Sequence, residues 1–126
     1  MNYQILIVDD SPLLRATAKR AVLQAGALLE NVREAGNGQE ALASLQAKPA
    51  DIVLLDINMP VMDGYQFVEA KQKDASLSEV RVALVTTEGN RERLSRMTAL
   101  GVEHYLRKPF EPEELRDLVK DMFQTT

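Results

Sequence analysis

The 126-residue sequence contains no cysteine and no tryptophan, and only 5% of its residues are aromatic. Without cysteine the chain has no disulfide framework, no thiolate metal site and no cysteine nucleophile. This suits a reducing environment, and we expect a cytoplasmic protein. The single histidine, His104, is expected to be a half-exposed strand residue rather than a metal ligand. The few aromatic rings also offer little for stacking on a flavin.

Long apolar runs and an excess of positive charge are missing as well. No apolar stretch approaches the ~20 residues that span a bilayer, and residues 1–4 lack the basic and apolar regions of a signal peptide. The net charge of −4 argues against direct binding of nucleic acid through its phosphates. With no linker, repeat or low-complexity tail, residues 1–126 are expected to form one domain without an attached output domain.

The sequence does contain five short runs, most of them apolar, that are too short for helices. The run at 52–55 (Ile-Val-Leu-Leu) is continuous and rich in branched residues, which is typical of a strand buried on both faces. The run at 31–35 is more polar and predicts an edge strand. The predicted strands are 4–8, 31–35, 52–55, 80–85 and 102–106.

A helical pattern follows each predicted strand. Ser11 is expected to cap the first helix, with Pro12 at its first position and Gly26 at its end. The other helices are expected between Gly38 and Pro49, over 65–73 and 90–100, and from Pro112 onward. Strand and helix alternate five times, which predicts a doubly wound, three-layer α/β domain with a five-stranded parallel sheet.

Polar side chains appear where the predicted strands end. They are Asp9 and Asp10 after the first strand, Asp56 after the third, Thr86 and Thr87 after the fourth, and Lys108 after the fifth. The carboxyl ends of parallel strands share one edge of the sheet, where ligands bind. Three carboxylates there would repel one another by roughly 3 kcal/mol per pair at ~5 Å. A cation is therefore expected, and oxygen-only ligands favour Mg²⁺.

Lys108 and the threonine hydroxyls are suited to phosphate oxygens, as a point charge and as hydrogen-bond donors. A carboxylate nucleophile at Asp56, Mg²⁺, a lysine and a hydroxyl together indicate an acceptor of phosphoryl groups. The plainer alternative for Asp56 alone is that it caps or solvates a strand end. For Asp63 the plainer interpretation is an ordinary N-cap of the helix that follows.

The same positions carry a resemblance to a known family. They are the acidic pair Asp9-Asp10, Asp56, the loop from Asn58-Met59-Pro60 to Asp63-Gly64, Thr86, Tyr105 and the run Lys108-Pro109-Phe110. Over essentially its whole length the chain resembles the receiver domain of bacterial two-component response regulators, most closely the single-domain chemotaxis type. The resemblance implies a flavodoxin-like sheet with strand order 2-1-3-4-5.

The resemblance also implies a role for each site residue. Asp56 would take a phosphoryl group from a phosphohistidine on a sensor kinase or phosphotransfer protein, or from a small donor such as acetyl phosphate. Asp10 would bind Mg²⁺ directly and Asp9 largely through water. Asp56 and the backbone carbonyl of Asn58 would complete the protein ligands. Lys108 would pair with a phosphoryl oxygen.

A conformational switch is implied as well. Thr86 would move to hydrogen-bond the phosphoryl group, and Tyr105 would swing into the space that it leaves. This would reshape the face formed by the fourth helix, fifth strand and fifth helix, where a downstream protein would bind. Three arginines are expected on the fourth helix, either as a solvated face or as partner contacts: Arg91, Arg93 and Arg96. The Lys108–Pro109 bond is expected to be cis.

Residues beside the acceptor bear on how long the phosphoryl group lasts. Asn58 and Glu88 resemble the pair that permits its rapid loss in chemotaxis regulators, so a short-lived phosphorylated state is expected. Thr87 departs from the family, which usually has alanine or glycine there, and its bulk would restrict access to the phosphoryl group. Phosphotransfer and self-catalysed loss are the only chemistry expected, so the chain is not expected to be an enzyme.

Other functions are compatible with parts of the pattern. An aspartyl-nucleophile phosphatase would have a second acid at position 58, where Asn58 cannot protonate a leaving group. A flavin carrier would not place Asp9 and Asp10 against a flavin phosphate. Within the receiver family, the alternatives are a phosphorelay intermediate, a phosphate sink, or a scaffold that is never phosphorylated.

Overall fold

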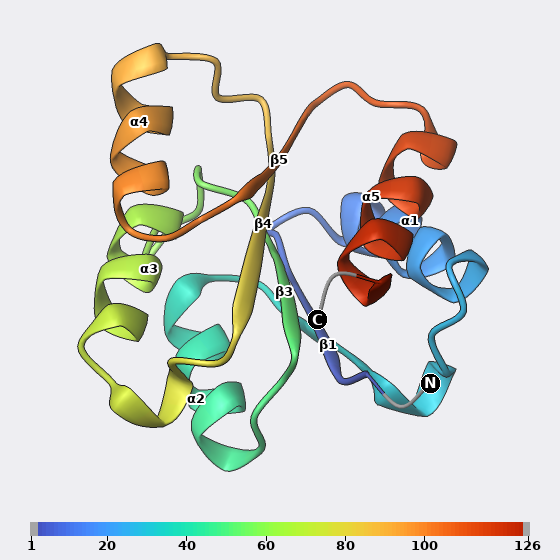
Figure 1. Ribbon diagram of the computed structural model, residues 1–126, viewed down its shortest axis with the longest axis horizontal. Helices are drawn as coiled ribbons and strands as arrows, with labels where there is room; N and C mark the ends of the chain where they lie inside the picture. Colours follow the sequence, from blue (N-terminus) through green and yellow to red (C-terminus); the bar gives the residue numbers. More distant parts are fainter. Residues whose placement is uncertain (1–2, 125–126) are drawn as a thin grey trace.

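The computed structural model describes residues 3–124, which form a five-stranded parallel sheet between two layers of helices (Figure 1). The strands are β1 (Ile5–Val8), β2 (Val32–Ala35), β3 (Ile52–Leu55), β4 (Arg81–Thr86) and β5 (His104–Arg107). The helices are α1 (Pro12–Gln24), α2 (Gly38–Ala47), α3 (Gly64–Gln72), α4 (Arg91–Ala99) and α5 (Pro112–Gln124). Two 3-10 turns, η1 (Leu29–Asn31) and η2 (Ala75–Leu77), precede β2 and β4.

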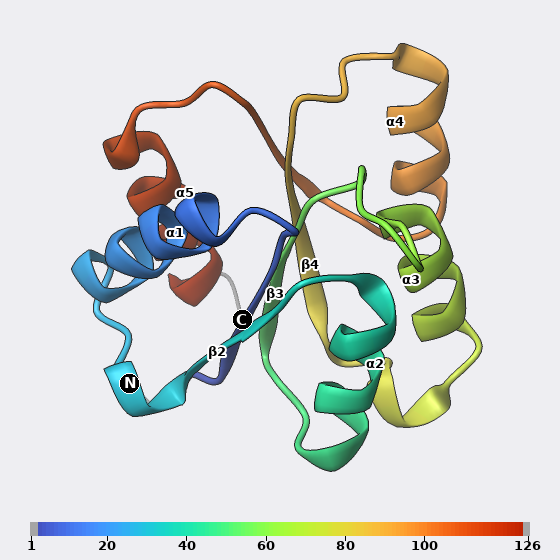
Figure 2. The ribbon, with the colours of Figure 1, turned by 180° about the vertical axis from the view of Figure 1, so that it is seen from behind.

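The strand order is β2-β1-β3-β4-β5, which confirms the order implied by the resemblance. Helices α1 and α5 cover one face of the sheet, and α2, α3 and α4 cover the other (Figure 1, Figure 2). Because successive residues of a strand point to opposite faces, each strand contributes to both layers. In β1, Ile5 and Ile7 pack in the α1–α5 layer, whereas Leu6 and Val8 pack in the opposite one. The predicted three-layer architecture is confirmed.

Four strands begin one or two residues later than the sequence predicts, and in β2 and β5 the first predicted residue completes a neighbouring turn. The Asn31 N–H donates to the Leu28 carbonyl oxygen at 2.9 Å, so Asn31 belongs to η1 and β2 starts one residue later. The Val102 N–H donates to the Met97 carbonyl oxygen at 3.1 Å and closes the end of α4. Strand β5 therefore starts at His104, which is half-buried as expected.

Helix starts follow the predicted capping residues. The Ser11 hydroxyl accepts a hydrogen bond from the Leu14 N–H at 3.2 Å, and Pro12 occupies the first position of α1. Asp63 and Gln66 form a capping box at the start of α3, so the interpretation of Asp63 as an N-cap is confirmed. None of the helices within residues 3–124 is long and apolar enough to cross a membrane.

The start of α3 packs directly on the backbone that carries Asp56. A Cβ atom at Gly64 would lie 2.7 Å from the Asp56 carbonyl oxygen and 2.8 Å from the Ile57 Cα atom, which is closer than real Cβ atoms come. The Gly64 N–H donates to the Ile57 carbonyl oxygen at 2.8 Å. Only glycine permits this approach, so the sequence Asp63-Gly64 both caps α3 and fixes it beneath the end of β3.

Candidate phosphoryl-acceptor site

Three aspartates meet at the carboxyl edge of the sheet. Strands β1 and β3 are neighbours, with Val8 beside Leu55 in register, so the residues that follow each strand lie side by side. One carboxylate oxygen from each of Asp9, Asp10 and Asp56 lies within 4.8 Å of the other two. Asp9 and Asp56 are buried, whereas Asp10 is exposed. The structure thus brings together the three carboxylates that the sequence places at strand ends.

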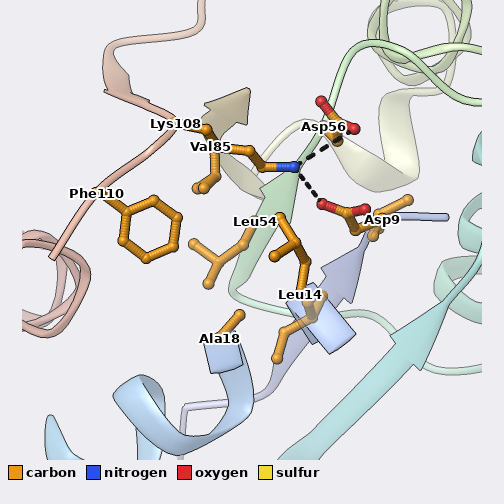
Figure 3. A pocket seen from close by; sticks show the side chains of 10 residues that line it. Asp9, Leu14, Ala18, Leu54, Asp56, Val85, Lys108 and Phe110 are labelled. Atoms are coloured by element: carbon orange, nitrogen blue, oxygen red, sulfur yellow. Dashed lines mark hydrogen bonds and ion pairs between the residues drawn. The ribbon is translucent and has the colours of Figure 1, made fainter. Parts of the chain in front are cut away.

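Lys108 reaches this cluster from the end of β5 (Figure 3). Its Nζ lies 2.7 Å from Asp9 Oδ2 and 3.6 Å from Asp56 Oδ2, and its side chain is only 12% exposed. The Lys108 N–H donates to the Thr86 carbonyl oxygen at 2.9 Å, which ties it to the end of β4. The Lys108–Pro109 bond is cis, as predicted. The ammonium therefore relieves part of the repulsion among the carboxylates.

Backbone amides orient two of the carboxylates. Asp9 Oδ1 accepts from the Ser11 N–H at 2.9 Å, and Asp56 Oδ1 accepts from the Ile57 N–H at 2.8 Å. The Arg15 guanidinium donates to the Asp9 backbone carbonyl at 2.6 Å and pairs with Glu34 on β2 at 3.0 Å, so it ties the acidic edge to the neighbouring strand. Sequence reasoning missed Arg15. Its position one helical turn after Ser11, at the start of the helix that leaves the acidic edge, is the signal that could have found it.

The charge and the donor atoms of the cluster fit a hard divalent cation. Three carboxylates and one ammonium leave two net negative charges at a largely buried site. At separations of ~5 Å, like charges still repel by roughly 3 kcal/mol per pair at an effective dielectric of about 20. The side chains of the cluster offer only oxygen ligands, which hard cations prefer. The cluster could therefore hold a metal ion.

An apolar hollow of about 10 Å³ lies beside the Lys108 ammonium (Figure 3). It is lined by side chains from α1, from the sheet and from the segment between β5 and α5. Its apolar lining includes Leu14, Ala18, Leu54, Val85 and Phe110. This lining keeps bulk water away from one side of the charged groups and lowers the local dielectric. The attraction between the ammonium and the carboxylates is strengthened as a result.

The residues predicted to form the switch are both connected to Glu88. Thr86 is fully buried, and its hydroxyl accepts from the Glu88 N–H at 3.2 Å. Tyr105 is 40% exposed, and its hydroxyl donates to the Glu88 carbonyl oxygen at 2.8 Å. Asn58 and Thr87, the other predicted neighbours of the acceptor, are exposed at the same edge. The loop after β4 therefore joins Thr86 to Tyr105 through the backbone of a single residue.

The Glu88 carboxylate itself pairs with Arg93 on α4, at 2.9 Å between Oε1 and Nη1. This hydrogen bond is the largest influence on the Glu88 carboxyl and holds its pKa below the ordinary value. Sequence reasoning treated Arg91, Arg93 and Arg96 alike, as an exposed helix face. All three are exposed. Arg93 nevertheless binds Glu88, and the Arg96 guanidinium carbon lies 5.3 Å from the centre of the Tyr65 ring.

Comparison with known proteins gives a consistent result. The family described as response regulator receiver domain matches residues 5–120. Chemotaxis protein CheY1 of Helicobacter pylori is 33% identical over 123 residues, which cover 97% of this chain and 98% of the relative. Chemotaxis protein CheY-3 of Vibrio cholerae is 32% identical over 123 residues, covering 98% and 93%.

Solved structures extend the comparison to three dimensions. The structure of Vibrio cholerae chemotaxis protein CheY4 superimposes with a TM-score of 0.86 at 33% identity, covering 97% of this chain and 99% of that one. It is thus similar over the whole sheet and all its helices, not only at the acidic edge. The family matches residues 5–120, and the alignments with these relatives span nearly the full length of both chains. We conclude that the chain belongs to the response regulator receiver domain family, with chemotaxis proteins of the CheY type among its relatives.

Proposed function

We propose that residues 1–126 form a single receiver domain in which Asp56 accepts a phosphoryl group from a phosphohistidine of a partner kinase or phosphotransfer protein, or from a small phosphodonor. The observation that carries this proposal is the Lys108 ammonium, which lies between the carboxylates of Asp9 and Asp56 in a cluster of three aspartates. Membership of the receiver family supports it. The protein would act in the cytoplasm and would signal through protein partners.

Phosphoryl transfer would form a bond between an Asp56 carboxylate oxygen and phosphorus and would break the phosphorus–nitrogen bond of the donor, so that the histidine ring leaves as neutral imidazole. Asp56 Oδ1 is held by the Ile57 N–H, whereas Oδ2 faces Lys108 at 3.6 Å. Oδ2 is therefore the oxygen that we assign as nucleophile. Lys108 would exchange its contact with Asp9 for an oxygen of the incoming phosphoryl group.

Mg²⁺ is the cation that we propose for this site. Asp10 would bind it directly and Asp9 largely through water. Asp56 and the backbone carbonyl of Asn58 would complete the protein ligands. The oxygen-only donors and the two uncompensated negative charges of the cluster support this assignment. When bound, the cation would neutralise negative charge on the carboxylates and on the transferred group.

The signal would leave the site through the loop after β4. On phosphorylation the Thr86 hydroxyl would give up the Glu88 N–H and donate to a phosphoryl oxygen. Tyr105 would then turn inward, and the face formed by α4, β5 and α5 would change its affinity for a downstream protein. The contacts of both Thr86 and Tyr105 with the backbone of Glu88 support this coupling. A phosphorelay intermediate or a phosphate sink would use the same chemistry with a different partner.

The test is the intact mass of the protein after incubation with acetyl phosphate, with and without Mg²⁺. Addition of one phosphoryl group that requires Mg²⁺ and is lost in Asp56→Asn supports the proposal. Addition that persists in Asp56→Asn means that another residue is the acceptor. If neither acetyl phosphate nor a phosphorylated histidine phosphotransfer protein modifies the wild type, the chain is a scaffold. Steady turnover of a small phosphate ester would instead indicate a phosphatase.

A further inference from the structure

The contacts of the loop after β4 converge on Glu88. Its N–H and its carbonyl oxygen bind the hydroxyls of Thr86 and Tyr105. Its carboxylate points toward the first turn of α4. There Oε1 accepts from the Arg93 guanidinium at 2.9 Å, and Oε2 lies 3.5 Å from the Asn90 N–H. Backbone and side chain of this one residue thus have separate partners.

Arg93 lies in the first turn of α4. The Asn90 side chain caps this helix and accepts from the Arg93 N–H at 3.1 Å, which sets the guanidinium over the loop. The Glu88 side chain is 15% exposed, whereas the Arg93 side chain is 57% exposed. The carboxylate is therefore the sheltered half of the pair and the guanidinium the solvated half. Opening the pair requires only that Arg93 swing into water.

A second donor lies near Glu88. The Tyr65 hydroxyl, on α3, is buried and has no hydrogen-bond partner within the described residues. Burial raises the pKa of Tyr65, and the negative charge of Glu88 raises it further. Tyr65 follows Gly64, which packs on the carbonyl oxygen of Asp56. The Tyr65 hydroxyl is thus an unpaired donor on α3, near the Glu88 carboxylate, that could receive the carboxylate once it leaves Arg93.

We propose that Arg93 is a positioning residue that holds the Glu88 carboxylate against α4 and so lengthens the lifetime of the phosphoryl group on Asp56. This inference rests on the function proposed above. Loss of the group requires water, whose oxygen forms a bond to phosphorus while the bond to Asp56 breaks, releasing phosphate and restoring the carboxylate. A Glu88 carboxylate that is free to turn can accept a hydrogen bond from that water and orient it. Held by Arg93, it cannot.

The experiment follows the decay of the phosphorylated mass after the protein has been loaded with acetyl phosphate and Mg²⁺ and the donor has been removed. Because a solvated ion pair biases a conformation only weakly, Arg93→Ala is expected to shorten the lifetime by roughly two- to fivefold. Arg93→Lys retains a cation and should restore most of the wild-type lifetime. Arg91→Ala, which removes a neighbouring exposed arginine, is the matched control and should leave the lifetime unchanged.

Two further readouts separate positioning from a general structural effect. In a Glu88→Ala background, Arg93→Ala should change nothing, because the carboxylate that it positions is gone. The difference between wild type and Arg93→Ala should also shrink as salt is raised to about 1 M, because salt screens an exposed pair. An equal effect of Arg93→Ala with and without Glu88 overturns the proposal, as does an unchanged lifetime. If the wild type is never phosphorylated, the proposed function fails, and this inference fails with it.

Discussion

Helices α4 and α5 flank the β4–β5 edge of the sheet from opposite faces, but they are anchored very differently (Figure 1). Within α4 only Met97 is buried. Helix α5 buries four side chains: Leu115, Val119, Met122 and Phe123. Tyr3 also contacts the end of α5. Its ring stacks on that of Phe123 with 4.6 Å between the ring centroids, and its hydroxyl donates to the Phe123 carbonyl oxygen at 2.9 Å.

The contacts of α4 with its surroundings are mostly polar and lie at its surface. Arg93 binds Glu88, Arg96 lies over Tyr65, and the Gln72 side chain of α3 donates to the Leu100 carbonyl oxygen just past the end of α4. Exposed contacts of this kind contribute little to stability, and elements that depend on them open more readily than elements held by buried apolar area. We therefore expect α5 to act as a fixed support and α4 as the part that moves.

Truncation of one inward leucine on each helix would test this difference most strongly. Leu115→Ala on α5 removes a fully buried side chain and should lower the free energy of unfolding by about 2–5 kcal/mol. Leu94→Ala on α4 removes a partly buried one and should cost less than half as much. Urea denaturation measures both. Equal losses for the two variants would show that α4 is anchored as firmly as α5.

Amide hydrogen exchange would sharpen the comparison without mutation. Because α4 has one buried side chain and α5 has four, the central amides of α4 should exchange roughly tenfold faster or more than those of α5. Exchange should be followed residue by residue at neutral pH. Uniform protection along both helices would mean that the two open only together, in global unfolding.

Two tyrosine-to-phenylalanine variants compare one hydrogen bond at the end of α5 with one at the loop that precedes α4. Tyr3→Phe removes the donor to Phe123 at a partly buried site and should cost about 0.5–1.5 kcal/mol of unfolding free energy. Tyr105→Phe removes an equally short bond to Glu88, but at a side chain that is 40% exposed. Water replaces that bond readily, so the loss should be close to zero. A larger cost for Tyr105→Phe than for Tyr3→Phe would contradict the comparison.

A smaller effect is expected from Lys71, a buried lysine on α3. Burial lowers the pKa of this ammonium, so the unfolded chain holds the proton more tightly than the folded one. Wild-type stability should therefore rise with pH between the lowered pKa and the ordinary value. Lys71→Met should raise the unfolding free energy at neutral pH by about 0.5 kcal/mol. This gain should disappear at pH values above the ordinary lysine pKa, where the side chain is neutral in both states. A gain that is independent of pH would point to packing instead.

Local sequence signals were sufficient for the elements and for the convergence of the site. β3 occupies the predicted Ile52–Leu55 because a short apolar run between prolines has few other structures available. Asp9, Asp56 and Lys108 are neighbours because each follows a strand whose place in a parallel sheet fixes where it ends. Caps at Ser11 and Asp63 were equally local.

Contacts between elements were not predictable from such signals. Arg33 was expected only as part of a polar edge strand, yet its guanidinium donates to the carbonyl oxygens of Ser44 and Lys48 at the end of α2, at 3.0 and 2.7 Å. The pairing of Glu88 with Arg93 and the buried Tyr65 hydroxyl likewise depend on how a loop and a helix are placed in space. Residue type alone marks Glu88 and Arg93 as surface residues, and only the tertiary structure shows that they pair and that the Tyr65 hydroxyl is buried.

The contact between Asp9 and Lys108 also has a consequence for folding. It joins residues 99 positions apart in the chain and links β1 to β5, two strands that are separated in the sheet by β3 and β4. Contacts of such long range form late, because much of the intervening chain must be ordered first. A nascent chain that has folded only through β4 already holds all three aspartates, yet it lacks the ammonium that lies between them. The site is thus assembled only when the last strand docks, so a partly folded protein cannot reproduce its charge arrangement.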